Sequence, residues 1–246
     1  MKVSSVNLVP GTRVPDEDRI PINRIALSLR NQCIRNADIT DEIRNNYAAL
    51  QTNVITKFPQ DFVTVVNGGV VGDRHFAADW ITKIDNNWFN ASTYAQVSIL
   101  TKERYTELNT IYKKDVQAGQ FGENIQIEGS TPLEEMCAGT VLQFGDIAQI
   151  KITHLRTSCF KFINVLYPTV EEYFHWRKNV SHGEVSRIGV LGQVVQPGII
   201  RPNDPIKVIH IPDQFVKLGY MKRPNGVMEL TACAPPWDQT SNEKNA

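Results

Sequence analysis

The sequence predicts a mainly β fold of the α+β class: a closed or partly closed β-barrel with peripheral helices. Short β-like runs separated by Gly, Pro, Asn and Asp recur along the chain. Helical patterns do not alternate regularly with these runs, which disfavours a doubly wound parallel sheet. A closed sheet has no exposed edges, so a barrel is favoured over the alternative, a two-sheet sandwich.

Eight segments have strand-like patterns. Between residues 147 and 153, Ile150 and Ile152 fall on one face while Gln149 and Lys151 fall on the other. This period of two is typical of a half-buried strand. The predicted strands are 3–8, 62–66, 96–100, 124–128, 141–144, 148–153, 188–195 and 206–211.

Three helical patterns interrupt the strands. The first has Asp38 as a candidate cap and apolar residues at spacings of three and four, namely Ile39, Ile43, Tyr47, Leu50 and Val54. The second follows Thr101, with Tyr105, Leu108, Ile111 and Tyr112 as its apolar stripe. The third starts near Thr169, which has capping-box spacing to Glu172. Its aromatic residues are interpreted as packing residues: Tyr173, Phe174 and Trp176.

Length and composition limit the domain organisation and the classes of partner that the protein could have. The 246 residues suffice for one sizeable core, so we expect a barrel domain over 1–212 with a helical insertion at about 23–59. Residues 213–246 form a C-terminal extension whose end is expected to be disordered. With 26 basic and 26 acidic residues, the zero net charge favours neither nucleic acid nor a membrane surface as partner.

The chain has neither a signal-peptide pattern at its start nor a membrane-spanning apolar run, so a cytoplasmic location is expected. Its four cysteines are far apart and form no CxxC pair, which argues against a zinc finger: Cys33, Cys137, Cys159 and Cys233. Free, reduced thiols are therefore expected.

One cysteine has the surroundings of a reactive thiol. Cys159 lies between Arg156 and Lys161, and nearby cations lower a thiol pKa toward neutrality. The guanidinium of Arg156 can also bind an anion, and Thr157 and Ser158 add hydroxyl donors. The alternative is a buried structural cysteine beside solvated cations. A hydrolytic Cys–His pair is conceivable with His75, His154 or His182, although no protease signature is present.

Two further clusters combine glycine with polar residues. One spans 68–76 and the other 119–124, and glycine permits a positive φ or close backbone approach to a ligand. Ordinary surface turns are the alternative for both. The candidate ligand-binding residues are Gly72, Asp73, Arg74 and His75 in the first, and Gly122, Glu123 and Asn124 in the second.

Taken in order, these clusters resemble the MOSC domain family, the domain found at the C-terminus of molybdenum cofactor sulfurases. The resemblance extends over about 3–211. The matching segments are 3–7, 69–75, 96–100, 119–125, 138–142, 144–148, 156–159 and 198–204. Three segments depart from the family pattern. Leu155 and Ser158 replace prolines, Asn203-Asp204 replaces a Gly-Asp turn that Asn can also form, and no Lys is evident at 13–16.

The resemblance implies a pyruvate-kinase-barrel-like fold and a site for molybdenum cofactor (molybdopterin). Cys159 matches the family cysteine, which ligates molybdenum or carries sulfur as a persulfide. The resemblance implies cofactor contacts from Arg156, Thr157, Ser158, Lys161, Gly72, Asp73, Arg74, His75, Gly122, Glu123 and Asn124.

Three functions remain open at this point. The first is an oxidoreductase that reduces a small N-hydroxylated substrate with electrons from a donor protein. The second is a persulfide carrier supplied by a sulfur-donor protein. The third is a binding module without catalytic activity.

Overall fold

The computed structural model describes most of the chain and is dominated by β structure. The described residues are 1–8, 25, 28–29, 31–33, 35–51, 56–73, 81–84, 87–90, 96–129, 132–156, 165–179, 188–218, 222–223 and 228–229. All eight strands predicted from sequence are present, with ends shifted by a few residues at most.

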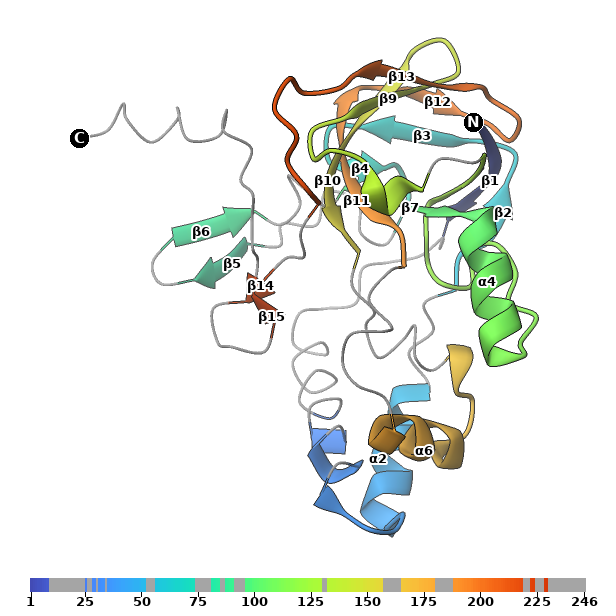
Figure 1. The fold of residues 1–246 in the computed structure, drawn as a ribbon, viewed down its shortest axis with the longest axis vertical. Helices are drawn as coiled ribbons and strands as arrows, with labels where there is room; N and C mark the ends of the chain where they lie inside the picture. The colour runs from blue at the N-terminus through green and yellow to red at the C-terminus, as the bar shows by residue number, and fades with distance from the viewer. Residues whose placement is uncertain are drawn as a thin grey trace.

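Eight strands form one large mixed sheet (Figure 1). In spatial order these are β13 (Ile206–His210), β9 (Val141–Phe144), β10 (Ala148–Leu155), β11 (Val190–Gln196), β7 (Val97–Thr101), β8 (Ile125–Glu128), β1 (Lys2–Leu8) and β2 (Phe58–Gln60). Neighbours pair antiparallel except β7 and β8, which are parallel.

Three smaller sheets accompany the large one. The first joins β12 (Gly198–Ile200), β3 (Val63–Val66) and β4 (Gly69–Val70). The others are the hairpins β5 (Ile81–Ile84) with β6 (Asn87–Asn90), and β14 (Lys222–Arg223) with β15 (Met228–Glu229). Sequence reasoning missed the short strand β4 that leads into Gly72 and Asp73, because two residues are too few for a periodic pattern.

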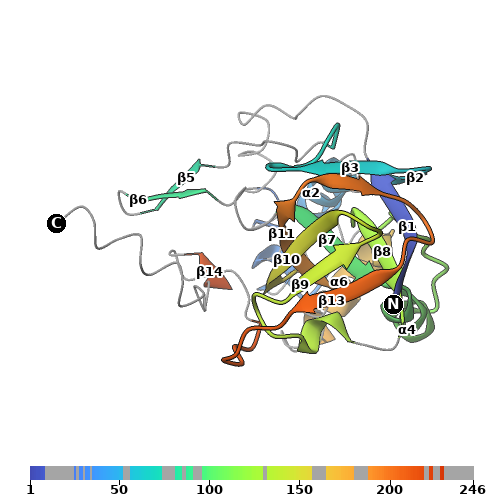
Figure 2. The same ribbon diagram turned by 90° about the horizontal axis from the view of Figure 1, so that it is seen from above.

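The large sheet is strongly curved, but the closed barrel predicted from sequence is not confirmed. Its strand order runs from β13 to β2 without forming a ring. The curvature nevertheless brings the start of β13 to the start of β1 (Figure 2). The Val3 N–H donates to the Asp204 carbonyl (2.9 Å), and the Ile206 N–H donates to the Met1 carbonyl (3.0 Å). Asn203 adopts a φ of 72° at this junction, so the turn expected from Asn203-Asp204 is formed.

The three predicted helices are confirmed as α2 (Asp41–Gln51), α4 (Lys102–Tyr112) and α6 (Val170–Asn179); a short 3₁₀ turn covers Leu133–Glu135. Thr169, predicted from its capping-box spacing, accepts a hydrogen bond from the Glu172 N–H (3.2 Å), and Thr101 caps α4 by accepting the Arg104 N–H (3.1 Å). The first cap is corrected. Thr40, not Asp38, accepts the Ile43 N–H (3.3 Å), because α2 starts two residues later than the pattern suggested.

The buried apolar residues form two cores. The first fills the concave side of the curved sheet and includes Val3, Ile99, Ile125, Phe144 and Ile150. The second joins the helical insertion to α4 and α6 and includes Leu29, Cys33, Leu50, Leu108 and Tyr173. Phe121 and Tyr105 also belong to this second core, next to the polar residues described below. In the described part of the chain, no helix combines the length and apolar character needed to cross a membrane.

Candidate functional site

The described parts of the three sequence clusters contact one another. Asp73 follows β4, and its Oδ2 accepts a hydrogen bond from Nδ2 of Asn124, just before β8 (3.0 Å). Arg156 follows β10, and its Nη2 donates to the carbonyl of Phe121 in the 119–124 turn. Three segments separated by about 30 to 50 residues therefore meet at one buried place, as the clustering of glycine with polar residues predicted.

Glycine conformation shapes the turns that carry these residues. Gly72 and Gly122 have φ values of 78° and 75°, which disfavour residues with a side chain. A Cβ on Gly119 would lie 2.2 Å from the carbonyl oxygen of Lys57. That close approach fixes residue 57 against the 119–122 turn, and the Lys57 N–H donates to the Gly119 carbonyl (2.8 Å).

A buried ion pair joins Lys57 to Asp73. Lys57 Nζ lies 2.8 Å from Asp73 Oδ2, and both side chains are almost inaccessible to solvent. Burial lowers the pKa of Lys57, while the charge and hydrogen bond of Asp73 oppose this shift. No sequence pattern indicated this lysine, since the expected position after the opening strand has none. Lys57 instead follows α2 near the end of the predicted insertion and precedes β2, which pairs with the end of β1.

Glu123 is fully buried and accepts hydrogen bonds at both oxygens. Oε1 accepts from the Gly119 N–H (2.5 Å) and from Nδ2 of Asn7 (3.3 Å), and Oε2 accepts from the hydroxyl of Tyr105 (2.6 Å). Burial raises the pKa of Glu123, and these hydrogen bonds act in the opposite direction. Burial also raises the pKa of Tyr105, so this phenol stays a donor at all physiological pH values.

Asn124 connects three strands through its side chain and backbone. Its Oδ1 accepts from the N–H (3.1 Å) and the hydroxyl (3.0 Å) of Ser98 at the start of β7. Its carbonyl accepts from the Asn7 N–H (2.7 Å) in β1. All polar atoms of this side chain are used within the protein, so Asn124 positions Asp73 and the strands around it.

Arg156 differs from the other members of the site in having one unused donor group. The side chain is 9% exposed, and its backbone N–H donates to the Gly189 carbonyl (2.9 Å). Nη2 is bound to Phe121, whereas the buried Nη1 has no hydrogen-bond partner among the described residues. A buried donor without a partner costs about 1–3 kcal/mol, so such an atom is typical of a group that binds a ligand.

We refer to Lys57, Asp73, Glu123, Asn124 and Arg156, together with Asn7, Ser98 and Tyr105, as the buried polar cluster. Its two cations and two carboxylates balance in charge. Sequence reasoning singled out Asp73, Glu123, Asn124 and Arg156 but missed the others. Asn7, Ser98 and Tyr105 lie in strand or helix patterns that give no sign of a polar contact.

Several predicted site residues lie outside the described residues, so their placement stays a prediction. These are Arg74, His75, Thr157, Ser158, Cys159 and Lys161. Among the other cysteines, Cys33 and Cys137 are both buried. Sγ of Cys137 accepts the Val216 N–H (3.1 Å), which is a structural contact. Cys233 also lies outside the described part of the chain.

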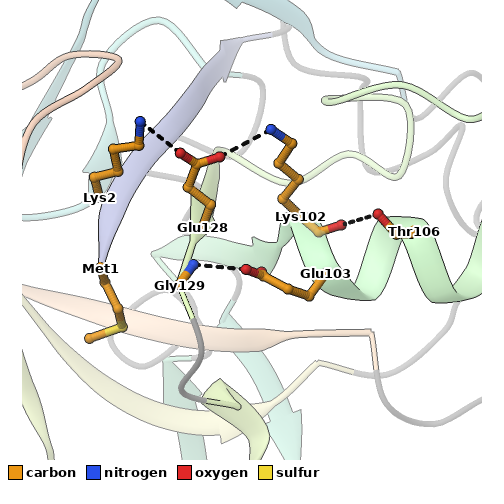
Figure 3. Close-up of a pocket in the computed structure, with 7 residues that line it drawn as sticks. All are labelled: Met1, Lys2, Lys102, Glu103, Thr106, Glu128 and Gly129. Atoms are coloured by element: carbon orange, nitrogen blue, oxygen red, sulfur yellow. Dashed lines mark hydrogen bonds and ion pairs between the residues drawn. The ribbon is translucent and has the colours of Figure 1, made fainter.

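A shallow cavity of about 700 Å³ lies apart from the buried polar cluster and shares no residue with it (Figure 3). Glu128 in this cavity pairs with both Lys2 (2.8 Å) and Lys102 (3.0 Å), which lowers its pKa. The two lysines are mostly exposed and already paired, so the cavity has no buried, unpaired group that would recognise a ligand. Its lining residues are Met1, Lys2, Lys102, Glu103, Thr106, Glu128 and Gly129.

Fold and site together define a mainly β protein whose curved sheet holds a buried, charge-balanced cluster at the end of β10. The model of the MOSC domain family matches residues 72–207, more than half of the chain. The protein therefore belongs to the MOSC domain family, and the resemblance inferred from its motifs is confirmed.

Two solved structures are similar to this chain, and the first of them shares its fold. The YuaD protein of Bacillus subtilis is 20% identical, with a TM-score of 0.50 over 62% of this chain and 86% of that one. YiiM of Geobacillus stearothermophilus is 16% identical, with a TM-score of 0.49 over 85% of this chain and 75% of that one. No curated protein matches the chain in sequence.

Proposed function

We propose that this protein binds molybdenum cofactor at the buried polar cluster, with the Cys159 thiolate as a ligand of the metal. The supporting observation is Arg156, a buried guanidinium with one donor group left unused by the described residues. Molybdopterin carries a phosphate, and a guanidinium is the side chain best suited to bind one. The residues present therefore fit an anionic group.

The chain length between Arg156 and Cys159 is compatible with one shared ligand. Three residues of extended chain span at most about 10 Å, so a thiolate at position 159 stays within ligand size of the Arg156 backbone. Thiolate is a soft ligand suited to a soft metal, whereas a serine oxygen at the same position would be a poor replacement.

The proposed reaction is the reduction of a small N-hydroxylated compound. The N–O bond breaks, two electrons and two protons are taken up, and the products are the N–H compound and water. The cofactor supplies the two-electron chemistry when bound, and a donor protein supplies the electrons. Arg156 binds the cofactor phosphate, while Asp73, held by Lys57 and Asn124, keeps the neighbouring turn in place.

The test is co-purification from a host that makes molybdenum cofactor. Molybdenum is measured by elemental analysis and the pterin by fluorescence after oxidation. We expect both in the wild-type protein, a loss in Cys159→Ser, and reduced content in Arg156→Ala. Cys137→Ala is the matched control, because that thiol contacts only backbone groups in the described structure.

Other outcomes identify the alternative functions. A persulfide on Cys159 without molybdenum would replace the proposed enzyme by a sulfur carrier. Absence of metal, pterin and persulfide would contradict both and leave a binding module.

A further inference from the structure

We propose that Tyr105, a residue of α4, is a positioning residue for the Arg156 guanidinium and leaves Nη1 as the one donor available to a bound anion. Tyr105 and Arg156 share no hydrogen bond. They are connected through Phe121 in the 119–124 turn, whose N–H donates to the Tyr105 hydroxyl and whose carbonyl accepts Nη2 of Arg156. The identity of the anion as the cofactor phosphate rests on the proposed function.

Four contacts form the connection. The Tyr105 hydroxyl donates to Oε2 of Glu123 (2.6 Å) and accepts the Phe121 N–H (3.3 Å), so it binds two residues of the turn. The Tyr105 and Phe121 rings pack with their centroids 4.8 Å apart. The Phe121 carbonyl then receives Nη2 of Arg156. A carbonyl fixed on both sides in this way orients a planar guanidinium.

The hydrogen bond of Nη2 also determines the direction in which Nη1 can donate. The two nitrogens are part of one rigid plane, so once Nη2 is bound to Phe121 the direction of Nη1 is set. Among the described residues, Nη1 binds nothing. The nearby cation Lys57 is different, because its ammonium is already paired with Asp73 at 2.8 Å. The charge of Lys57 is thus already neutralised by Asp73, whereas Nη1 of Arg156 is the donor that we assign to a bound anion.

Protonation of Glu123 makes this arrangement measurable, because it changes the affinity for an anion. Its carboxylate opposes the charge of Arg156, and the other groups that face it are Lys57, Tyr105 and the amide of Asn7. Protonation of Glu123 removes a negative charge near Arg156, so anion binding tightens as the pH falls. The hydrogen bond from Tyr105 lowers the pKa of Glu123. Removing it moves the tightening to higher pH.

The experiment measures sulfate binding to cofactor-free protein between pH 4.5 and 8 by calorimetry or NMR titration. Sulfate serves as the probe because it stays a dianion over this range. At pH 8, we expect Tyr105→Phe to weaken sulfate binding by about three- to tenfold, as for the loss of one or two hydrogen bonds. Its binding then tightens at a higher pH than in the wild type. Tyr112→Phe is the matched control, since it removes a hydroxyl from the same helix at a contact with Tyr167.

Glu123→Gln is the second variant, for the case that Tyr105→Phe does not fold. It has no titrating carboxylate, so the tightening at low pH should disappear. Unchanged sulfate binding in Tyr105→Phe, or weaker binding with an unshifted pH profile, would overturn the proposal. Equal sulfate binding by wild type and Arg156→Ala would overturn it as well. If the sulfate results hold but no molybdenum or pterin co-purifies, the positioning role stands and the proposed function fails.

Discussion

Lys57 and Asp73 form the buried ion pair on which the shape of the buried polar cluster depends. A buried pair brings little net stability, because desolvation offsets the attraction of the charges, but breaking it leaves one charge buried alone. This asymmetry explains why Lys57 contributes mainly to the specific arrangement of the turn at Asp73. It also makes the pair a good target for substitution.

We predict that Lys57→Met destabilises the protein by about 3–5 kcal/mol, because the Asp73 carboxylate stays buried without its cation. The free energy of unfolding is measured by urea denaturation. The double variant Lys57→Met with Asp73→Asn should recover part of the loss. Arg44→Ala breaks the exposed pair with Glu171 and should cost much less. Equal losses for the buried and exposed pairs would contradict the prediction.

His154, two residues before Arg156 in β10, links stability to pH. The side chain is 6% exposed, and burial lowers its pKa below the usual 6.5. The unfolded chain then binds a proton before the folded chain does, so the free energy of unfolding decreases as the pH falls below about 6.5. The decrease continues down to the folded-state pKa and stops there.

The measurement compares denaturation of wild type and His154→Gln at several pH values from 7.5 down to 5. We predict that the difference in stability between the two proteins shrinks as the pH falls. Taking the difference removes the contribution of Glu123, whose raised pKa acts with the opposite sign. A difference that is constant with pH would show that His154 does not titrate as argued.

At the scale of elements, the sequence patterns predicted the features that depend on residues close together in the chain. The alternation in β10 and the Thr169 cap depend on residues close in sequence, and both appear in the structure. The second half of β10 is buried on both faces, which a period of two does not predict. This half still contributes Ile152 and Leu155 to the first core, and it leads to Arg156 in the buried polar cluster. The contact of Lys57 with Asp73 needs the whole insertion to be folded, so no local pattern could reveal it.

Helix α4 provides a test of capping beside the site. Thr101 is its N-cap, and its side chain accepts the Arg104 N–H. We predict that Thr101→Ala lowers the free energy of unfolding by about 1 kcal/mol and that Thr101→Ser retains most of it. Thr106→Ala, on the exposed face of the same helix, is the control and should change stability little. Equal effects of Thr101→Ala and Thr106→Ala in urea denaturation would argue against the cap.

At the scale of the whole molecule, the sequence predicted a mainly β protein, which is confirmed, and helix α2 lies within the segment 23–59 that was predicted as a helical insertion. The predicted closed barrel is not confirmed, because ring closure depends on the pairing of distant strands and not on their patterns. Nor could the sequence predict that the insertion shares a core with α4 and α6, because helix–helix contacts between segments 50 or more residues apart leave no periodic signal.

Because the protein has two cores, we predict that each core opens locally on its own. The labelling rate of the buried thiol in each region measures this opening. Leu50→Ala removes a large side chain from the second core and should destabilise it by about 2–5 kcal/mol. Cys33 belongs to that core, so we predict faster iodoacetamide labelling of Cys33 in this variant under native conditions. Cys137, held beside Val216, should label at the wild-type rate. Peptide mass spectrometry measures both rates, and parallel acceleration would indicate one cooperative unit.

The hydrogen bonds between residues 1–3 and 203–206 have a consequence for synthesis of the protein on the ribosome. β1 is translated before its partners at 203–206, which are made about 200 residues later. At about 5–20 residues per second, the nascent chain waits on the order of 10 to 40 seconds for them. During that time, the edge of β1 that later meets these residues can pair with strands of other nascent chains. Ribosome-bound chains should therefore need chaperone protection until the last strand of the large sheet has emerged.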